Sequence, residues 1–347
     1  MTTQEVSARS RPDAASGFDV TVLIVGYRSR DTIGRCLDAL ARQTCRPARI
    51  LLLENGSPEG ERILPDEVPA GIEFIASEVN LGFAGGNNRL AAMASTTWLV
   101  LLNPDAFARD DWVENLVLAT RKYPEAAMFG STQYASGQDG LLDGVGDVYS
   151  AAGLAYRAGY GRPVSLLPPD GEVFGACGAA LLIRRELFES LAGFDERFFC
   201  YNEDVDLAYR ARLAGHVTIQ LRDAAVDHLG YASSGRRSEF ATYYGVRNRL
   251  WVFMKNTPGW LFWLLAPVHA VVTLLLWLSS ARFGQAGVFF RALRDALAAR
   301  ADMFRSRREI QAARTVSAWT IARAMSWNPL NLVTRAPDVR PYPRVEE

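Results

Sequence analysis

Four apolar runs, separated by more polar segments, open the sequence. Each is rich in Val, Ile and Leu, which predicts strands buried on both faces; the runs are 20–27, 49–55, 72–77 and 98–103. Between the first two, Ile33, Leu37 and Leu40 recur at helical spacing after Asp31, which can cap a helix. A small-residue helix is expected from the glycine-rich segment 80–88 to about residue 95. This order of strands and helices predicts an open α/β sheet.

Polar side chains stand where these four strands end. They are Tyr27, Glu54, Asn55, Asn80, Asn103 and Asp105. In open α/β sheets, ligands bind outside the carboxyl ends of the strands. We therefore expect these residues to lie together at one edge of the sheet and to form a binding site.

The second part of the α/β region is less regular. A glycine-rich connector, 136–161, is too long for ordinary structural linkage. A strand is expected over 172–185, and Asn202 then occupies the N-cap position of a helix with acidic residues in its first turn. The mixed region is completed by an alternating strand and a short final segment, at 216–223 and 226–230.

The C-terminal third changes in character. Residues 256–281 contain no Asp, Glu, Lys or Arg, and a helix of this length would span the ~30 Å hydrocarbon core of a bilayer. Arginines flank the segment on both sides, whereas a single crossing favours positive charge on the cytoplasmic side only. Pro267 interrupts the middle, as a kink or a hairpin apex would. We favour a re-entrant or interface-lying segment followed by a basic amphipathic helix; a single span and a buried helix are the alternatives.

These patterns divide the chain into three parts. We expect a disordered polar tail over 1–18, an α/β domain over 19–235 and a helical region over 236–347, whose segment 256–281 associates with a membrane. The tail has no apolar core, so it does not resemble a secretory signal.

Composition excludes several classes of protein. Lys and Arg together number 38, as do Asp and Glu, which argues against general binding to nucleic acid. The four cysteines form no C-x-x-C pair and no zinc-ligand spacing with the three histidines, so structural thiols in a reduced cytoplasmic setting are expected. Gly82, Gly85 and Gly86 form neither the dinucleotide-binding G-x-G-x-x-G motif nor a P-loop. A dehydrogenase or a kinase is therefore poorly supported.

Asn103 and Asp105 are the first candidates for metal binding. Residues i and i+2 of an extended segment point the same way, and amide and carboxylate oxygens suit Mg²⁺ or Mn²⁺. Taken alone, Asn-Pro-Asp after a strand is more often a simple turn. His228 is a candidate further ligand for the metal or a phosphate, with a structural histidine as the alternative.

An acidic cluster lies in the first turn of the helix after Asn202. Its members are Glu203, Asp204 and Asp206. Acids at this position are stabilised by the helix dipole whatever else they do. Aromatic residues just before them could form the apolar wall of a cleft, where a carboxylate could accept the proton of an attacking hydroxyl.

Six blocks of sequence together resemble family 2 glycosyltransferases, and most closely the rhamnosyltransferase-like branch. In chain order the blocks are VLIVGYRSRDTIGRCLDALARQT, LLLENGSPEG, NLGFAGGNN, LLNPDA, GFDERFFCYNEDVDLAYRARLAG and HLG. The resemblance covers roughly residues 19–255, and NPDA and FFCYNEDVDL are its most specific parts. It implies a GT-A fold, in which an open mixed sheet is flanked by helices, with a sugar nucleotide donor and an inverting transfer.

The resemblance also implies roles for single residues. Asn103-Pro104-Asp105 represents the D-x-D metal motif, with Asp105 the firmer ligand for Mg²⁺ or Mn²⁺ and His228 near the metal or diphosphate. Asp204 is the implied general base, paired with Glu203. The implied donor-binding residues are Tyr27, Glu54, Asn55, Asn80, Gly82, Asn87 and Asn103, and those near the acceptor or its diphosphate are Asp206, Arg247 and Arg249.

The expected function is transfer of L-rhamnose from dTDP-rhamnose to a polyprenyl-diphosphate-linked saccharide or polysaccharide acceptor. The apolar segment and the basic helix after it place this reaction at the cytoplasmic face of the cell membrane. A UDP-sugar such as UDP-galactofuranose is the alternative donor. A nucleotidyltransferase and a non-catalytic sugar-nucleotide-binding protein are the alternative classes.

Overall fold

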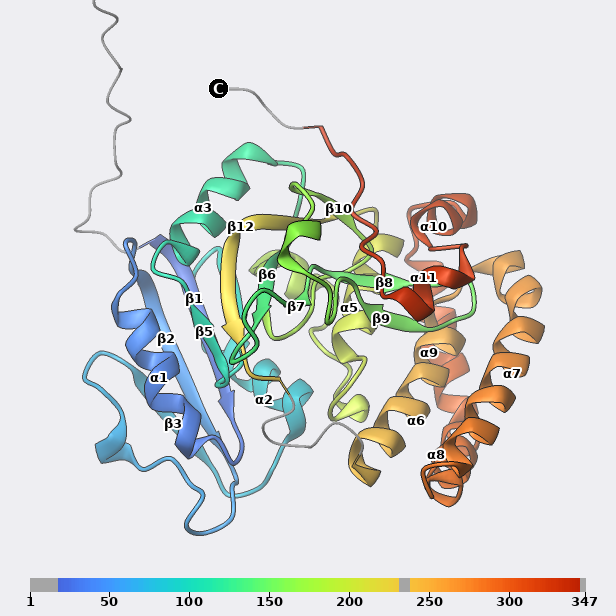
Figure 1. Cartoon of the computed structure of the whole chain (residues 1–347), viewed down its shortest axis with the longest axis horizontal. Helices are drawn as coiled ribbons and strands as arrows, with labels where there is room; N and C mark the ends of the chain where they lie inside the picture. Colours follow the sequence, from blue (N-terminus) through green and yellow to red (C-terminus); the bar gives the residue numbers. More distant parts are fainter. Residues whose placement is uncertain (1–17, 231–237, 344–347) are drawn as a thin grey trace, which may run out of the picture.

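The computed structural model describes residues 18–230 and 238–343, so the expected tail lies almost wholly outside the described residues. One ten-stranded mixed sheet forms the centre of the described chain (Figure 1). Its main path runs β10-β12-β6-β11-β4-β1-β2-β3, with β5 paired to β12 and β7 paired to β6. The α/β fold class expected from the sequence is confirmed.

The N-terminal half of the sheet is parallel, as the apolar runs predicted. It consists of β1 (Phe18–Gly26), β2 (Pro47–Asn55), β3 (Glu73–Ser77) and β4 (Trp98–Leu102), connected in part by α1 (Arg30–Ala41) and α2 (Gly82–Ala91). The register pairs Gly26 with Glu54 and Asn55 with Ser77. The carboxyl ends of these strands therefore meet at one edge, and the polar residues that follow them are brought together there.

The second half of the sheet is mixed. After β5 (Ala106–Ala108) and α3 (Trp112–Lys122), the chain forms β6 (Met128–Ala135), β10 (Gly171–Val173), β11 (Ala180–Arg184), α4 (Arg185–Ser190), α5 (Glu203–Leu213) and β12 (Thr218–His228). Strand β11 lies antiparallel between β4 and β6, whereas β12 runs parallel to β6.

Two strand boundaries differ from those expected. The segment predicted as one strand over 172–185 forms β10 and β11, because the chain between them turns toward α5. A Cβ on Gly175 would lie only 2.7 Å from Ala208 of that helix. Conversely, the two segments expected at 216–223 and 226–230 belong mainly to the single strand β12, whose register shifts between Leu221 and Ala225.

The long connector over 136–161 is not structureless. It contains β7 (Leu142–Gly144), β8 (Asp147–Tyr149) and β9 (Ala155–Arg157). Strand β7 extends the pairing of β6, and β8 and β9 form a separate antiparallel hairpin. The connector thereby brings charged residues toward the carboxyl-end edge of the sheet.

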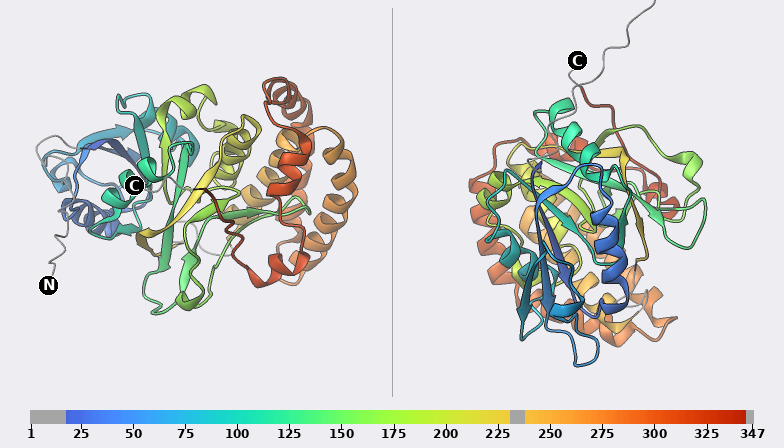
Figure 2. Two further views of the ribbon diagram at one scale, coloured as in Figure 1. Left: turned by 90° about the horizontal axis from the view of Figure 1, so that it is seen from above. Right: turned by 90° about the vertical axis from the view of Figure 1, so that its left-hand side faces the viewer.

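The C-terminal helices lie beside α5, on the right in Figure 1 and again to one side in Figure 2. They are α6 (Glu239–Asn256), α7 (Gly259–Ala281), α8 (Ala286–Ala298), α9 (Arg300–Ala312), α10 (Ala318–Ala324) and α11 (Pro329–Thr334). One apolar cluster joins them to the sheet region, with members Tyr149, Tyr209, Trp251, Leu265, Phe289, Met303 and Ile321. The predicted division at residue 235 falls within 231–237, outside the described residues.

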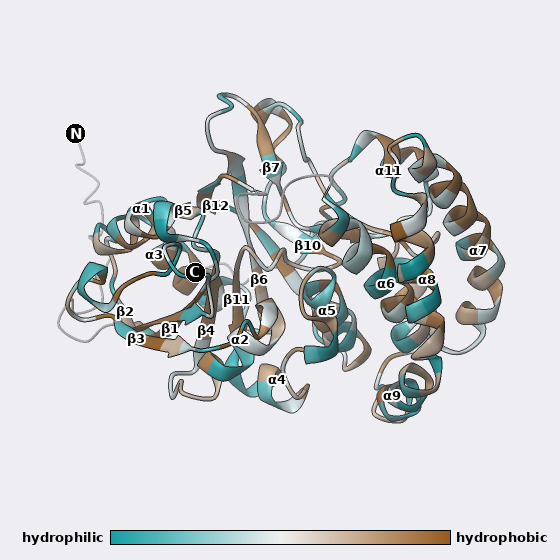
Figure 3. Cartoon of the chain, turned by 90° about the horizontal axis from the view of Figure 1, so that it is seen from below, coloured by the Kyte–Doolittle hydropathy of each residue, from teal (hydrophilic) through white to brown (hydrophobic). Residues whose placement is uncertain are grey.

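A kink and a hairpin apex were the two alternatives at Pro267. Helix α7 continues through this proline, so the hairpin apex is not formed. Its buried stripe consists of Leu261, Phe262, Leu265, His269 and Thr273. Its other side is apolar and exposed (Figure 3), with Trp263, Leu264, Val268, Val271, Leu274, Leu275 and Leu278. The helix is long and apolar enough to cross a membrane by length and composition, but one side of it packs against protein.

A buried ion-pair cluster joins α5 to α6. The Asp206 carboxylate is fully buried and accepts hydrogen bonds from Arg210 Nε at 2.8 Å and Asn256 Nδ2 at 2.8 Å. Lys255 Nζ lies 2.9 Å from Asp206 and 2.5 Å from Asp195. Burial alone would raise the pKa of Asp206, but Lys255 and Arg210 lower it. The charge on Asp206 therefore stabilises the junction.

Asp206→Ala should destabilise the protein by about 3 to 5 kcal/mol, because it leaves two buried cations without their shared partner. Urea unfolding followed by circular dichroism measures this change. A carboxyl with a lowered pKa stabilises the fold above its unfolded pKa, so the difference from wild type should shrink as the pH falls below about 4. Asp302→Ala breaks an exposed pair with Arg305 and should cost less than about 1 kcal/mol; equal costs would contradict this role for Asp206.

Candidate active site

A cleft of about 1160 Å³ lies at the carboxyl ends of β1, β2 and β4. Its opposite side is formed by the start of α5, the first turns of α6 and the β8–β9 hairpin. The predicted site residues that line it are Tyr27, Asn55, Asn80, Gly82, Asn103, Asp105, Asp204 and His228. Sites for one drug-sized ligand usually measure about 300 to 1,000 Å³, so this cleft has room for more than one substrate.

Asp105 and His228 form the first chemical feature of the cleft. Strand β5 pairs with β12, so Ala106 lies opposite His228 and the imidazole stands beside Asp105. His228 Nε2 is 3.4 Å from Asp105 Oδ1, and Nδ1 is 2.7 Å from Asp143 Oδ2. Asp143 is itself paired with Arg157 at 2.5 Å. The Asp143 carboxylate therefore orients the ring through Nδ1, and Nε2 lies beside the Asp105 carboxylate.

This arrangement fits a divalent cation. His228 Nε2 is buried and makes no hydrogen bond to the described residues. Metal-binding histidines typically hold their second ring nitrogen against a carboxylate, as His228 does with Asp143. Asp105 contributes a carboxylate oxygen beside the free nitrogen, and Asn103 lines the same cleft. Oxygen and imidazole ligands of this kind suit Mn²⁺ and, with more oxygen donors, Mg²⁺.

The charge state of His228 depends on its two carboxylate neighbours. Burial alone would lower the pKa of His228, but Asp105 and Asp143 outweigh burial and raise it. Burial would likewise raise the pKa of Asp143, but His228 and Arg157 lower it. The two carboxylates therefore keep the proton on the imidazole to a higher pH than usual.

Asp204 stands at another part of the cleft, in the first turn of α5. Its Oδ2 accepts a hydrogen bond from Gly178 N at 2.9 Å, and its Oδ1 accepts one from Val205 N at 2.8 Å. Backbone N–H donors and the N-terminus of a helix stabilise a negative charge. Asp204 is thus a carboxylate that faces the cleft and is positioned by the backbone.

The backbone just before Asp204 is unusual. Phe199, Tyr201 and Asn202 all have positive φ, at 65°, 70° and 65°. Asn202 occupies the expected N-cap position, but its side chain makes no capping hydrogen bond. Non-glycine residues in such conformations cost on the order of 1 to 3 kcal/mol each and persist only where neighbours hold them. We call residues 199–202 the strained segment.

Helix α6 supplies the contact that holds the strained segment. Asn248 is fully buried, and its Nδ2 donates to the carbonyls of Phe198, Cys200 and Tyr201 at 2.9, 2.8 and 2.7 Å. On the other side, the Phe199 carbonyl accepts a hydrogen bond from Ala84 N at 3.2 Å. Asn248 could not be identified from the sequence, because a single amide within a helix gives no local indication of the carbonyls that it will bond.

Three predicted residues near the cleft do not line it. Glu54 turns inward, where its oxygens accept hydrogen bonds from Ser57 N at 2.7 Å and Ile63 N at 3.0 Å. Asn87 is buried and donates to the Phe83 carbonyl at 2.9 Å. Glu203 is also buried; burial, and then the charge of Asp204, raise its pKa well above the usual range. The fold therefore does not bring these side chains to the cleft surface.

The three residues expected near the acceptor also lie outside the cleft lining. Asp206 belongs to the buried cluster between α5 and α6. Arg247 donates from Nη2 to the carbonyls of Arg197 and Phe198 and lies over the Trp251 ring. Arg249 is buried and donates to Thr273 Oγ1 at 3.1 Å on α7. Asp206 and Arg249 are buried and Arg247 is half-buried, and all three side chains make contacts within the fold.

The charged residues that the connector contributes were not predicted from the sequence. Asp143 orients His228, Arg157 pairs with Asp143, and Asp147 lines the cleft near Asp204. The signal was the length of the glycine-rich segment, which had been recognised as more than a linkage. The partner of Asp143, His228, is 85 residues away in the sequence, so the segment alone could not assign a role to each residue.

Comparison with known proteins identifies the family. Residues 21–192 match the model described as glycosyl transferase family 2. The chain belongs to glycosyltransferase family 2. A relative from Mycobacterium tuberculosis, named N-acetylglucosaminyl-diphospho-decaprenol L-rhamnosyltransferase, is 28% identical over 246 residues. The alignment covers 62% of this glycosyltransferase and 77% of that protein.

Solved structures agree on the GT-A fold. A mannosyltransferase from Pyrobaculum calidifontis, in complex with GDP-Man and Mn²⁺, superposes with a TM-score of 0.52 at 16% identity, covering 87% of this glycosyltransferase and 88% of that chain. GalNAc-T7 with UDP, GalNAc and Mn²⁺ superposes with a TM-score of 0.55 at 14% identity, covering 70% and 48%. The implied GT-A fold and the glycosyltransferase class are thus both confirmed.

The Asp105–His228 pair predicts that Mn²⁺ binding depends on pH. Ligation through Nε2 requires loss of the ring proton, which the raised pKa retains to a higher pH than usual. The affinity for Mn²⁺ should increase by up to about tenfold per pH unit below that pKa and become constant above it. Isothermal titration calorimetry from about pH 6 to about pH 9 covers this range around the pKa of histidine.

The matched variant for this measurement is Asp143→Asn, which removes one of the carboxylates that raise the pKa of His228. The plateau in Mn²⁺ affinity should then begin at a lower pH. An affinity for Mn²⁺ that does not change with pH would contradict ligation by His228.

Proposed function

We propose that this glycosyltransferase moves L-rhamnose from dTDP-rhamnose, with inversion, to a polyprenyl-diphosphate-linked saccharide in cell-envelope glycan synthesis. The observation that carries the proposal is one cleft that contains both the Asp105–His228 pair and the backbone-positioned carboxylate of Asp204. The name of the mycobacterial relative supports the sugar and the type of acceptor.

The donor half of the proposed site lies at the strand ends. Tyr27, Asn55 and Asn80 line the cleft there, and Asn55 Nδ2 donates to Asn80 Oδ1 at 3.1 Å. Asn55 and Asn80 also accept hydrogen bonds from the backbone of Leu81 and Gly82, which holds the start of α2 against β2. Side chains fixed in this way can bind a nucleotide with little loss of conformational entropy.

Asp105, with Asn103 and His228, would hold the divalent ion of the proposed reaction. Such an ion, when bound, stabilises the negative charge of the diphosphate leaving group. The Mn²⁺ present in two solved glycosyltransferase structures of the same fold supports a divalent cofactor.

Asp204 is the proposed general base. Its carboxylate removes the proton of the acceptor hydroxyl as the oxygen of that hydroxyl attacks the anomeric carbon. Attack from the side opposite the leaving diphosphate inverts the configuration of the sugar. The aromatic side chains of Phe199, Phe240 and Tyr244 line the same cleft and would form an apolar part of its wall.

The exposed apolar side of α7 is the proposed membrane contact. An apolar surface of this length is larger than the scattered exposed residues of ordinary soluble proteins. Basic residues of α8 and α9 lie nearby in the chain, among them Arg291, Arg294 and Arg305, and would attract anionic headgroups. Because α7 packs on α6, α8 and α10 along its other side, we propose that it lies at the cytoplasmic surface of the membrane.

Asp204→Asn should reduce kcat by about 10² to 10⁴, because an amide cannot accept the proton. The assay is release of nucleoside diphosphate from dTDP-rhamnose, with Mn²⁺ and a lipid-linked N-acetylglucosamine acceptor. Donor affinity, measured by calorimetry, should remain close to that of the wild type. Excess chelator should abolish turnover, and added Mn²⁺ or Mg²⁺ should restore it.

Glu203→Gln is the matched variant, because Glu203 is adjacent to the base but lies outside the cleft lining. An equal loss of turnover in the two variants would overturn the assignment of Asp204. Turnover with UDP-galactofuranose but not with dTDP-rhamnose would reject the proposed donor. Release of pyrophosphate would instead indicate a nucleotidyltransferase.

Replacing Leu274 and Leu278 together by Glu should weaken binding to anionic liposomes, because both leucines are more than half exposed on α7 and would place charges in the apolar layer. Liposome flotation of the full-length protein measures binding. Leu118→Glu on α3 changes an equally apolar exposed residue elsewhere and should leave flotation unchanged. Point variants are preferable to deletion of the C-terminal helices, which pack on α6. Equal flotation of all three proteins would contradict the contact.

A further inference from the structure

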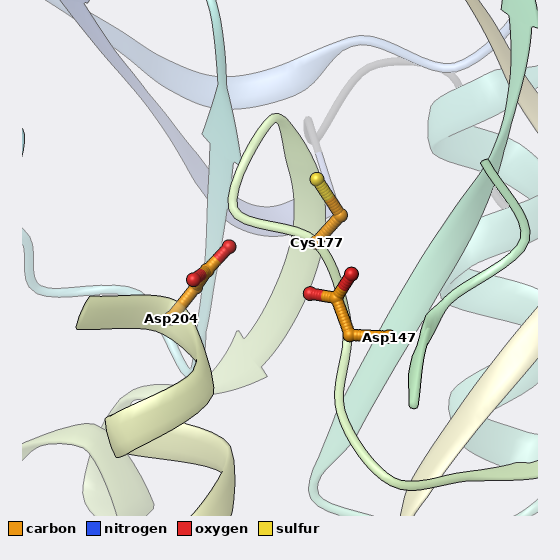
Figure 4. A group of neighbouring side chains, drawn as sticks. All are labelled: Asp147, Cys177 and Asp204. Atoms are coloured by element: carbon orange, nitrogen blue, oxygen red, sulfur yellow. The ribbon is translucent and has the colours of Figure 1, made fainter. Parts of the chain in front are cut away.

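Asp147 is a buried residue of the cleft whose carboxyl group has no role in the reaction proposed above. It lies on β8 and is 8% exposed. Its carboxylate converges with the carboxylate of Asp204 from α5 and the thiol of Cys177 from the loop before β11 (Figure 4). Ligand atoms of the three side chains all lie within 4.8 Å of one another. A buried carboxyl group, Asp147, therefore lies close to a half-buried one, Asp204, at the surface of the cleft.

The surroundings of the two carboxyl groups differ. Asp204 accepts two backbone N–H hydrogen bonds and lies at the N-terminus of a helix. In contrast, no described residue donates a hydrogen bond to the Asp147 carboxylate. Arg157, on the partner strand of the same hairpin, is 2.5 Å from Asp143. The environment thus stabilises negative charge on Asp204, and Asp147 is the more readily protonated of the two groups.

The described groups around Asp147 have opposing effects, and those that raise its pKa are the stronger. Burial first, and then the charge of Asp204, raise the pKa of Asp147 to about 8, and Arg157 only partly offsets them. Glu203, also on α5, has a pKa raised well above its usual range by burial and so adds little negative charge. Burial raises the pKa of Cys177 to about 12, so its thiol is neutral.

We propose that Asp147 acts as a neutral carboxylic acid that donates a hydrogen bond to the Asp204 carboxylate and so positions the base. This inference rests on the proposed role of Asp204. Pairs of acidic groups whose environments separate their proton affinities are a recurring way to divide acid and base roles. Asp147 is thus a positioning residue, and the pair carries one proton and one negative charge.

The proton balance of the transfer is simple. The O–H bond of the acceptor breaks, its proton goes to Asp204, and its oxygen bonds to the anomeric carbon. The bond from that carbon to the diphosphate oxygen breaks, and its electron pair leaves with the diphosphate. Asp147 keeps its own proton throughout. If Asp147 ionised, the hydrogen bond would be lost and a second negative charge would face both Asp204 and an anionic donor.

A metal site is the competing explanation for this cluster. A protonated thiol and a protonated carboxyl are poor ligands, because metals bind the thiolate and carboxylate forms. The protonated forms of Cys177 and Asp147 therefore favour a hydrogen-bonded proton between Asp147 and Asp204 over a bound cation. Binding of Mn²⁺ by an Asp147 variant separates the two explanations.

The test compares Asp147→Asn with Asp147→Ala in nucleotide-release assays across pH. The amide mimics the neutral acid, because it keeps an N–H donor of the same shape. Asp147→Asn should therefore retain turnover at neutral pH, and Asp147→Ala should lose about 10- to 100-fold in kcat, the usual effect of one hydrogen bond to a charged group. Wild-type kcat should fall as the pH rises through the pKa of Asp147, and this fall should be absent from Asp147→Asn.

The pH profile identifies the responsible group. Cys177→Ser should keep the alkaline fall in kcat, which excludes the thiol. A fall retained in Asp147→Asn, an increase of wild-type kcat over the same pH range, or equal damage in the Asn and Ala variants would each overturn the inference.

A second measurement does not need turnover. Because the buried Glu203 can also hold a proton, infrared difference spectra between neutral and alkaline pH are compared between the wild type and Asp147→Asn. The wild type should show an additional protonated carboxyl band. Its absence from the wild type would overturn the inference even if rhamnosyl transfer is observed. Its presence in a protein without turnover would support the inference while rejecting the proposed function. Mn²⁺ affinity should be equal in the two proteins; a loss in Asp147→Asn would overturn the proton pair in favour of a metal site.

Discussion

One buried amide holds the part of the chain on which the rest of the site depends. The Asn248 side chain bonds three carbonyls of a segment that contains three non-glycine residues at positive φ. That contact offsets the cost of the unusual backbone, which leads directly into the first turn of α5. Because Asn248 belongs to α6, the C-terminal helices are part of the structure that forms the candidate site. They are more than an anchor attached to a complete domain.

The parts of the site that could be predicted from sequence are those set by local patterns. Apolar runs gave the parallel strands, and the end of each run placed Asp105, Asn80 and Asn55 at one edge. The acids after Asn202 were likewise recognised from a local pattern, as the first turn of a helix. Each of these inferences needs only a few neighbouring residues and the rule that ligands bind at the carboxyl ends of strands.

The rest depends on contacts between distant parts of the chain. Asp143 acquires its role from His228, which is 85 residues away, and a glycine-rich connector gives no local indication of that pairing. Glu54 and Asn55 are neighbours at the end of β2. The Glu54 carboxylate nevertheless turns inward and accepts hydrogen bonds from Ser57 N and Ile63 N. Similarly, the composition of α7 predicted an apolar helix, but only packing decides which stripe of it faces protein.

The contact between Gly82 and Phe199 links the two halves of the cleft. Gly82 has φ of 71°, and a Cβ there would lie 2.4 Å from the Phe199 carbonyl, which also accepts a hydrogen bond from Ala84. The loop proposed to bind the donor and the segment that positions the base therefore share backbone contacts. In kinetic terms, a donor bound to this loop as proposed would also restrain the segment before Asp204, which would favour an ordered mechanism with the donor bound first.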